Sequence, residues 1–225
     1  MPSAAAGANV LSIDRAKTLR ELALEKMRWA ILEAHFDAGS RLVERTLCDQ
    51  LNVSRSVVRE VLRHLEAEGL VESTAQGPVV ATLSQGQAME IYDLRALLEG
   101  HAAARCAELA TDEQILELIS LNRRIQEAFA ANDLRSVMLR TTDFYEAMFR
   151  IAGQQVAWSV VSGLNARINL LRLKTIGSPG RAADAGREMQ RILEALRARD
   201  APAANAAAIE HVQSVARLAG RLISA

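Results

Sequence analysis

Residues 44–77 read ERTLCDQLNVSRSVVREVLRHLEAEGLVESTAQG, a pattern that predicts a helix, a turn, a second helix and a hairpin. Apolar residues recur at helical spacing on both sides of Asn52, which marks a buried face on each helix. Asn tolerates the left-handed backbone on which many helices end, so the first helix should stop at Asn52. Ser54 should cap the second helix, which Gly69 ends. The hairpin is then expected within residues 70–81.

The second helix places its positive charge on a face away from the core. Arg59 and Arg63 are four residues apart and therefore share one helix face. Arg can bind phosphate or the O6 and N7 edge of guanine, Ser can bind phosphate or base, and a helix N-terminus offers N–H groups to phosphate. This pattern favours binding in a duplex major groove, although a helical hairpin with a solvated arginine face is the other interpretation. The residues expected at DNA are Ser54, Arg55, Ser56, Arg59 and Arg63.

Composition and charge limit the classes of protein that the chain can belong to. Its 225 residues suffice for two modest domains, and only 4% are aromatic beside abundant Ala and Leu, which favours a mainly helical fold. The formal net charge is zero, so DNA binding would depend on a local basic patch. No apolar run approaches the roughly 18 residues of a membrane span, and the N-terminus lacks the order of a signal peptide. We therefore expect a cytoplasmic protein without membrane contact.

Helix breakers divide the chain into a tail and two domains. Residues 1–15 are small and polar and should be disordered. A DNA-binding domain should span residues 16–82, and helical periodicity without any strand signal then fills residues 84–224. Short loops favour an antiparallel bundle there. Its six helices are expected near 84–109, 111–131, 132–152, 154–176, 181–199 and 201–223.

Two ordered sets of motifs resemble a family of regulators. Residues 36–71, FDAGSRLVERTLCDQLNVSRSVVREVLRHLEAEGLV, resemble the winged helix-turn-helix domain of GntR-family transcription regulators. The second half resembles the helical FCD domain of the FadR-type members, and its helix count is similar to that of the VanR-like subgroup. This resemblance implies a homodimeric DNA-binding regulator, commonly a repressor. The FCD-like stretches are residues 92–100, 107–113, 144–154 and 190–200.

The resemblance also implies particular DNA contacts. Arg45 would hold a phosphate or an edge base, and Gly77 or Gln76 would lie at the tip of the wing. Arg55 or Arg59 would read guanine. The two winged domains of a dimer would meet the two half-sites of an inverted-repeat operator. The small hydroxyl positions of the family correspond to Ser54 and Ser56.

The chain departs from its family at a metal site. Many FCD domains hold a divalent metal with one Asp and three His. Local motifs place those four positions at Thr141, Tyr145, Met189 and His211, so only His211 is retained. One imidazole cannot hold Zn²⁺, which takes about four N, O or S ligands. We therefore expect no metal and no other cofactor, and His211 could equally be an ordinary buried or surface histidine.

An effector pocket without a metal needs another way to hold an anion. Family effectors are usually small carboxylates or other metabolites, and a guanidinium offers a planar fork to a carboxylate. The candidates are Arg95 on the first helix of the second domain and Arg167 and Arg172 on the fourth. A solvated face or a surface ion pair is the alternative for each. We expect a small organic acid held by Arg95 and Arg172, with Thr141, Tyr145, Met189 and His211.

Three other functions are alternatives to a ligand-responsive regulator. An enzyme is disfavoured, because the sequence has no Gly-rich phosphate loop, no G-x-S-x-G, no H-E-x-x-H and only four scattered His. A helical adaptor without specific DNA binding stays open if the arginine face is only solvated. A FadR-like acyl-CoA sensor also stays open, and it would need a continuous apolar tunnel.

Overall fold

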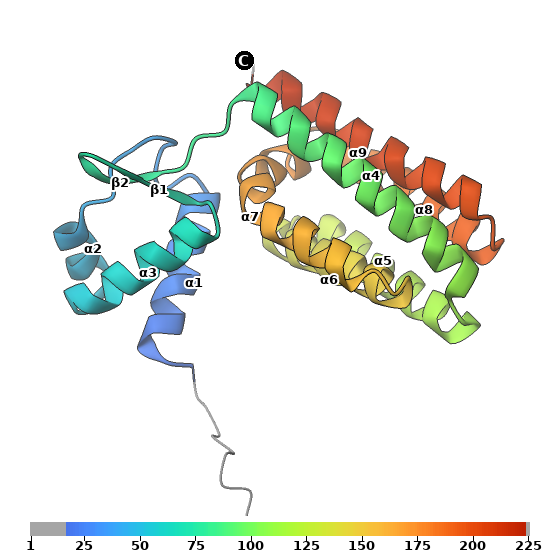
Figure 1. Ribbon diagram of the computed structural model, residues 1–225, viewed down its shortest axis with the longest axis horizontal. Helices are drawn as coiled ribbons and strands as arrows, with labels where there is room; N and C mark the ends of the chain where they lie inside the picture. Colours follow the sequence, from blue (N-terminus) through green and yellow to red (C-terminus); the bar gives the residue numbers. More distant parts are fainter. Residues whose placement is uncertain (1–16, 224–225) are drawn as a thin grey trace, which may run out of the picture.

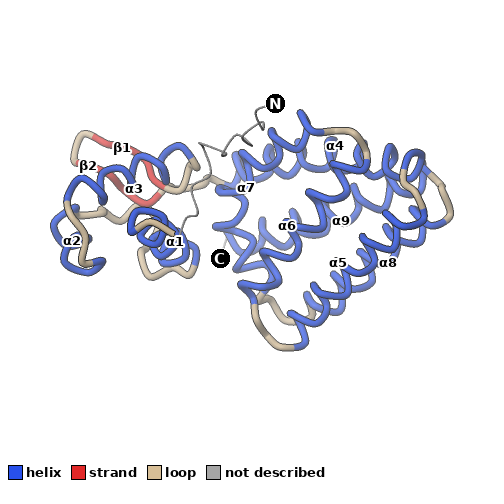
Figure 2. Tube along the Cα trace, turned by 90° about the horizontal axis from the view of Figure 1, so that it is seen from below, coloured by secondary structure: helices blue, strands red, loops and turns tan. Residues whose placement is uncertain are grey.

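The computed structural model describes residues 17–223, apart from the side chains of Asn165, Ala166 and Leu170. The chain forms an N-terminal lobe with a small β-hairpin and an all-helical C-terminal lobe, joined by a short connection (Figure 1, Figure 2). The predicted fold class is confirmed. The tail predicted at residues 1–15 lies outside the described residues. Within the described part of the chain, no helix is both long and apolar enough to cross a membrane.

The N-terminal lobe is a winged helix-turn-helix. Helix α3 (Arg55–Ala67) packs against both α1 (Leu19–Leu32) and α2 (Glu44–Leu51), and a short turn joins α2 to α3. The wing is an antiparallel pair, β1 (Val71–Thr74) and β2 (Gly77–Val80), in which Val71 lies opposite Val80 and Thr74 opposite Gly77. The wing and the three helices bury one apolar core between them.

Local signals account for the ends of the winged helices. Asn52 ends α2 with φ 52° and ψ 49°, as predicted, and the Oγ of Ser54 accepts a hydrogen bond from the backbone N–H of Val57 at 3.5 Å. Gly69 follows the last residues of α3 with φ +75°. Helix α2 begins at Glu44. A carboxylate in the first turn is favoured by the partial positive charge of a helix N-terminus.

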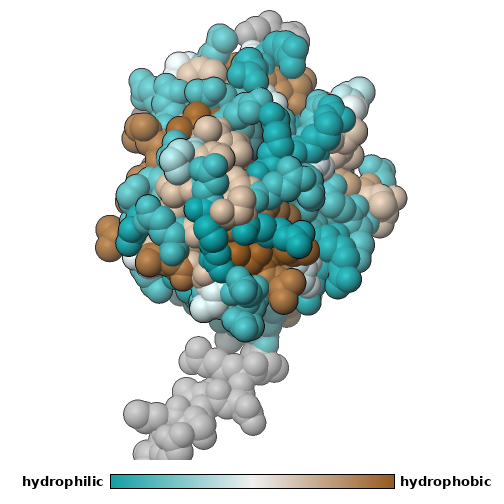
Figure 3. All heavy atoms as spheres, turned by 90° about the vertical axis from the view of Figure 1, so that its right-hand side faces the viewer, coloured by the Kyte–Doolittle hydropathy of each residue, from teal (hydrophilic) through white to brown (hydrophobic). Residues whose placement is uncertain are grey.

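The C-terminal lobe is a bundle of six helices among the described residues. Helices α4 and α9 lie side by side along most of their length, and α5 packs between α6 and α8 (Figure 1, Figure 2). The end of this lobe that faces away from the winged lobe is mostly hydrophilic (Figure 3). Each helix lies where the sequence predicts one: α4 (Gln85–Leu109), α5 (Asp112–Ala130), α6 (Leu134–Ile151), α7 (Gln155–Ile176), α8 (Arg181–Arg197) and α9 (Ala201–Ile223).

Side-chain caps start three of these helices. Ser84 and Thr111 form capping boxes with Gln87 and Gln114, and Asp133 accepts from the backbone N–H of Ser136 at 3.0 Å. Each cap satisfies N–H groups that have no partner inside the helix. The sequence therefore determines where the helices begin, and packing between them determines how closely they approach.

The contact between α4 and α9 depends on a glycine, and this generates a stability prediction. A Cβ atom at Gly100 would lie 2.8 Å from Cγ1 of Ile209 and 3.1 Å from Nδ2 of Asn205. We expect Gly100→Ala to lower the free energy of unfolding by about 1–3 kcal/mol, because α9 must shift to make room. Gly163→Ala is the matched control, since nothing lies within 4 Å of its added Cβ. That variant should gain about 0.5–1 kcal/mol from helix propensity.

Urea unfolding followed by far-ultraviolet circular dichroism measures both variants. If Gly100→Ala proved as stable as Gly163→Ala, the close approach of α4 and α9 would not limit the residue at position 100.

Candidate nucleic-acid interface and ligand cavity

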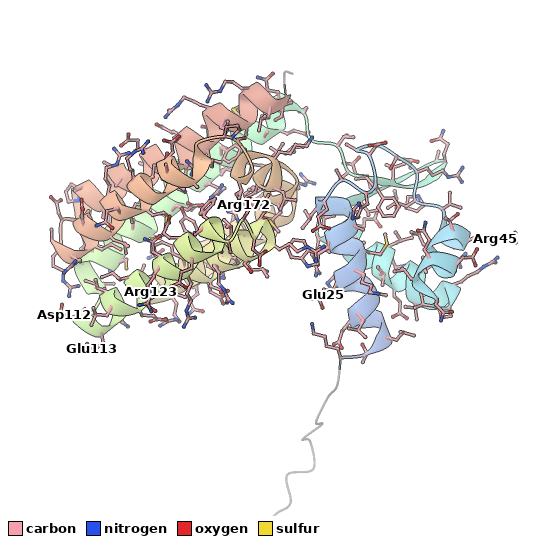
Figure 4. All side chains as sticks on the ribbon, turned by 180° about the vertical axis from the view of Figure 1, so that it is seen from behind. Glu25, Arg45, Asp112, Glu113, Arg123 and Arg172 are labelled. Carbon is pink, nitrogen blue, oxygen red and sulfur yellow. The ribbon has the colours of Figure 1, made fainter. Side chains whose placement is uncertain are left out.

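One surface of the winged lobe displays the side chains that the sequence assigns to DNA. Figure 4 shows Arg45 at the outer edge of this lobe, on the side away from the helical lobe. The first turns of α3 follow directly after α2 and present their polar residues to solvent. The exposed residues of this surface are Arg45, Ser54, Arg55, Ser56, Arg59 and Arg63.

The charges on this surface are mostly uncompensated. Arg45, Arg55 and Arg63 make no hydrogen bond or ion pair with any other residue in the described part of the chain. The Oγ atoms of Ser54 and Ser56 lie 2.8 Å apart at the N-terminus of α3. Free guanidinium groups beside a helix N-terminus suit phosphate groups. The surface can therefore bind the backbone of a duplex and offer donors to its bases.

Arg59 differs from its neighbours because an acidic side chain holds it. Its Nε donates to both carboxylate oxygens of Glu44, at 3.1 Å to Oε1 and 3.0 Å to Oε2. The contact joins α3 to the first residue of α2. Our sequence analysis did not identify this pair, because the two residues are 15 positions apart and lie on different helices.

The wing contributes a backbone position and one further arginine. The turn lies at Ala75 and Gln76, and Gly77 begins β2 with φ +112°, a conformation that L side chains rarely adopt. A Cβ atom at Gly77 would lie 3.6 Å from the guanidinium group of Arg41. Arg41 is exposed and pairs with Val79 through an isolated bridge. Arg41 was not among the residues predicted from the sequence, although a charged residue directly before the apolar Leu42 indicates an exposed position.

A cavity of about 50 Å³ lies inside the helical lobe, and all six helices contribute to its wall. Figure 4 shows Arg172 among the helices of this lobe, far from Arg45. Tyr145 lies beside the cavity, because its ring is 6.4 Å from that of His211, but it does not belong to the lining. The predicted effector residues that line the cavity are Arg95, Thr141, Arg172, Met189 and His211.

The hydroxyl of Thr141 already has a partner within its own helix. Its Oγ1 donates to the backbone carbonyl of Val137 at 2.7 Å. The oxygen can still accept a hydrogen bond from a ligand. Thr141 and Val137 together make α6 a wall of the cavity.

Two buried ion pairs form around the cavity. Arg95 Nε donates to Glu99 Oε1 at 2.7 Å, one helical turn further along α4. Arg181 Nη1 donates to Glu188 Oε2 at 2.8 Å, two turns further along α8. The side chains of all four are at most 7% exposed. Such pairs persist in a low-dielectric interior only because each charge has its partner.

Arg172 is a buried charge without such a partner. Its guanidinium bonds only to the amide oxygen of Asn169, at 3.4 Å, within the described residues. Burial and the neighbouring Arg95 lower the pKa of Arg172 to about 10, so it stays charged at neutral pH. Three buried guanidinium groups then face two buried carboxylates, Glu99 and Glu188. The surroundings of the cavity therefore have an excess of one positive charge.

His211 is held in one tautomer. Its Nδ1 lies 2.8 Å from Glu188 Oε2. Burial lowers the pKa of His211, and Arg181 lowers it further, so the ring is neutral at neutral pH. Burial alone would raise the pKa of Glu188, but hydrogen bonds from His211 and Ser214 lower it to about 2. The carboxylate therefore accepts from Nδ1–H, which leaves Nε2 as an acceptor on the cavity wall.

Two buried oxygens near the cavity have unused hydrogen-bonding capacity. Glu99 Oε2 and the hydroxyl of Tyr145 both lie outside hydrogen-bond geometry to any polar atom in the described residues. Burial and the nearby Glu99 raise the pKa of Tyr145 well above its usual value, so its hydroxyl stays protonated. A neutral phenol can donate to a ligand or to water.

The residues at the four metal positions do not match a divalent-metal site. Only His211 offers a typical metal donor, and its Nδ1 is occupied by Glu188. Three guanidinium groups, of Arg95, Arg172 and Arg181, line the same space and would repel a cation. In the described part of the chain, no group of three or more His, Cys, Asp or Glu side chains could hold a metal ion.

The structure corrects one candidate and adds others. Arg167 is exposed and lies over the winged lobe, where an added Cβ at Gly69 would be 2.9 Å from its Nε. It therefore does not line the cavity, because five residues separate it from Arg172 and turn it to another face of α7. Sequence reasoning missed Glu99 and the pair of Arg181 and Glu188. The spacings of these pairs, four and seven residues, place both partners on one face of a single helix, and this pattern could have predicted the ion pairs.

Comparisons with known proteins agree with this architecture. Residues 19–80 match the family described as bacterial regulatory proteins, gntR family, and residues 90–214 match the FCD domain. The chain is 26% identical over 190 residues to the HTH-type transcriptional repressor RspR of Escherichia coli K12, covering 84% of this chain and 83% of that protein. It is 26% identical over 165 residues to the gluconate operon transcriptional repressor of Bacillus subtilis 168, covering 72% and 68% of the two chains.

A solved structure shows the same fold. That of E. coli McbR/YncC superposes with a TM-score of 0.73 at 21% identity, covering 92% of this chain and 99% of that one. The two matched families together span nearly all of the described residues in the expected order. The chain therefore belongs to the GntR family of DNA-binding transcription regulators, in the FadR-type subfamily with a C-terminal FCD domain.

Proposed function

We propose that this GntR-family regulator is a repressor whose operator binding changes when a small organic acid enters the cavity of the FCD domain. Regulators of this family are not enzymes, which leaves the nature of the ligand as the open question. Two of its relatives are named repressors, which supports repression over activation. The single observation behind the ligand class is Arg172, a buried guanidinium that makes no ion pair with a carboxylate in the described residues. The protein would act in the cytoplasm, where bacterial DNA lies.

The chemistry of the cavity restricts which class of acid can bind. One uncompensated positive charge suits one carboxylate, which a guanidinium binds through two parallel hydrogen bonds. The free Nε2 of His211 accepts hydrogen bonds, so it suits a hydroxyl on the same ligand. The ligand proposed is therefore a small hydroxy acid. A volume of about 50 Å³ is far below the roughly 300–1,000 Å³ of pockets for drug-sized molecules, which disfavours the acyl-CoA alternative.

We further propose that the cavity works without a metal. Arg172 then supplies the positive charge that a divalent cation supplies in metal-bearing relatives. The loss of three donor residues at Thr141, Tyr145 and Met189 supports this view. The six helices of the described FCD domain also support the VanR-like subgroup.

The proposed active form is a homodimer. An inverted-repeat operator has two-fold symmetry, which a dimer matches with one winged domain for each half-site. Helices α4 and α7 contact each other and carry exposed apolar side chains, which supports a self-associating face. These side chains are Leu94, Leu97, Val156 and Val160.

Two helices would transmit ligand binding from the cavity to the winged domain. Helix α6 supplies Val137 and Thr141 to the cavity wall, and its second residue, Arg135, reaches α1. Arg135 Nη2 donates to Glu33 Oε2 at 2.6 Å, its Nε donates to Oε1, and its guanidinium lies 4.8 Å above the ring of Trp29.

Helix α7 makes the second link. It supplies Arg172 to the cavity, and its Arg167 covers Gly69 at the end of α3. A ligand that draws Arg172 inward would therefore move α7, and α6 would follow because it packs against α7. Such a ligand can change operator affinity only if it binds one arrangement of the two domains better than the other.

The first prediction tests DNA recognition. A selection from random duplexes with the full chain should enrich an inverted repeat with fixed half-site spacing. Arg59→Ala should weaken binding to that duplex by roughly 1–3 kcal/mol, because it removes a fork of donors from the major groove. Fluorescence anisotropy measures the affinity. If no sequence were enriched even at low salt, the arginine surface would be only a solvated face, and the adaptor interpretation would replace this proposal.

The second prediction tests the charge excess. Arg172→Met should leave the stability of the ligand-free protein unchanged or higher, because it removes an unpaired buried charge. Arg181→Met is the contrasting variant, and it should lose about 2–4 kcal/mol because Glu188 stays buried without its cation. In wild type, short hydroxy acids such as lactate should raise the unfolding temperature, with or without EDTA. Arg172→Met should abolish that rise.

Differential scanning fluorimetry measures these shifts. An equal loss of stability in both variants would show that Arg172 already has a partner. If the acid still raised the unfolding temperature of Arg172→Met, the ligand would bind elsewhere. If EDTA removed the rise in the wild type, a metal would take part in ligand binding.

The third prediction tests the link between α6 and α1. Glu33→Gln removes the carboxylate under Arg135 and should broaden the distribution of distances between the two domains. Spin labels at Glu66→Cys and Arg123→Cys report it, with Cys48→Ser as background. Cys106 stays unlabelled because it is buried, which raises the pKa of its thiol to about 12.

Glu210→Gln is the matched control, because it breaks an exposed ion pair with Arg191 inside the helical lobe. Identical distance distributions in wild type and both variants would remove this contact from the proposed path.

A further inference from the structure

We propose that Glu44 is a positioning residue for base recognition, because it fixes the guanidinium group of Arg59 and leaves the outer nitrogen atoms of that group free for the major groove. The proposal rests on the DNA contact proposed above for Arg59. It assigns to an acidic side chain a role in choosing the DNA sequence. Glu44 is a surprising component of such a surface, because a carboxylate repels phosphate.

The geometry of the pair leaves the outer edge of the guanidinium unused. Only Nε of Arg59 contacts Glu44, at 3.1 and 3.0 Å from its two oxygens. Neither Nη atom has a partner in the described residues. Those two nitrogen atoms bear four of the five N–H donors of the side chain. A guanine can therefore accept two hydrogen bonds from the fork while Glu44 keeps its own contact.

Glu44 is more enclosed by the protein than Arg59 is. It is the first residue of α2, where the helix N-terminus favours a carboxylate. Its side chain is 32% exposed, whereas that of Arg59 is 60% exposed. The contact with this more enclosed carboxylate restrains the Arg59 side chain, which reduces the rotamer freedom that Arg59 must lose on binding DNA.

The other arginines of the surface show that this restraint is selective. Arg45, Arg55 and Arg63 have no acidic partner in the described part of the chain, so they can follow the phosphates. An exposed ion pair contributes little to folding stability. The main effect of the contact between Glu44 and Arg59 therefore falls on DNA binding. The Glu44 carboxylate cancels one positive charge of the surface, which lowers its affinity for any duplex. Its contact with Arg59 raises the preference for the correct base.

The test compares Glu44→Ala, Glu44→Gln, Arg59→Ala and the double variant in the full chain. Each is titrated with the selected operator and with a scrambled duplex of equal length. In Glu44→Ala, affinity for the scrambled duplex should rise about two- to fivefold, because one negative charge is lost. The ratio of operator to scrambled affinity should fall about tenfold. Glu44→Gln should retain part of the ratio, because its amide oxygen can still accept from Nε.

Glu60→Gln is the matched control. Glu60 is exposed on α3, its carboxylate lies 4.0 Å from Nε of Arg20, and its side chain makes no ion pair with Arg59. This variant should raise affinity for both duplexes alike and leave their ratio unchanged. Unfolding temperatures of all variants should stay close to that of the wild type, because the contact is exposed.

The double variant separates positioning from other roles. If Glu44 acts through Arg59, Glu44→Ala should cause no further loss of the ratio once Arg59 is alanine. A ratio that Glu44→Ala leaves unchanged would overturn the proposal, as would a loss that persists in the Arg59→Ala background, since Glu44 would then contact a base itself. If Arg59→Ala left the ratio unchanged, the proposed DNA contact of Arg59 would fail, and this inference with it.

Discussion

The FCD domain is organised around a balance of buried charge. Ionised side chains are costly in an apolar interior unless opposite charges and hydrogen bonds surround them. Arg95 and Arg181 meet this condition through Glu99 and Glu188, whereas Arg172 does not. Because all six helices of the domain line the same cavity, the positions of the helices depend on how that remaining charge is satisfied. An anion would complete an arrangement that the protein alone leaves one charge short.

This dependence extends to the winged domain through the same helices. The wall of the cavity includes α6 and α7, and these two helices also hold the winged domain through Arg135 and Arg167. Close-packed interiors do not deform continuously, so a change in the cavity tends to move whole helices. Glu33 and Trp29 both lie at the end of α1, which packs against α3, the helix that carries Arg55, Arg59 and Arg63. A short chain of contacts thus connects the ligand cavity to the DNA surface.

The sequence predicted what local chemistry decides. Asn52 ends one helix through its backbone and Ser54 begins the next through its side chain, so their roles are visible in a single stretch. Five of the six predicted effector residues line the cavity. They could be located because sequence motifs fix the helical register of each residue. Pairs formed across helices, above all Glu44 with Arg59, were not predictable, since nothing local brings them together. Arg167 was placed wrongly because its helix face was not compared with that of Arg172.

The zero net charge of the chain makes the placement of its arginines decisive. Several exposed arginines of the helical lobe face carboxylates, as Arg150 faces Glu117 and Arg191 faces Glu210, so they add little attraction for DNA. The winged surface instead leaves Arg55 uncompensated, and binding there is local and sensitive to salt. Arg59 and Arg172 then represent two uses of the same side chain. A carboxylate of the protein holds the guanidinium of Arg59, while that of Arg172 has no carboxylate at ion-pair distance in the described residues.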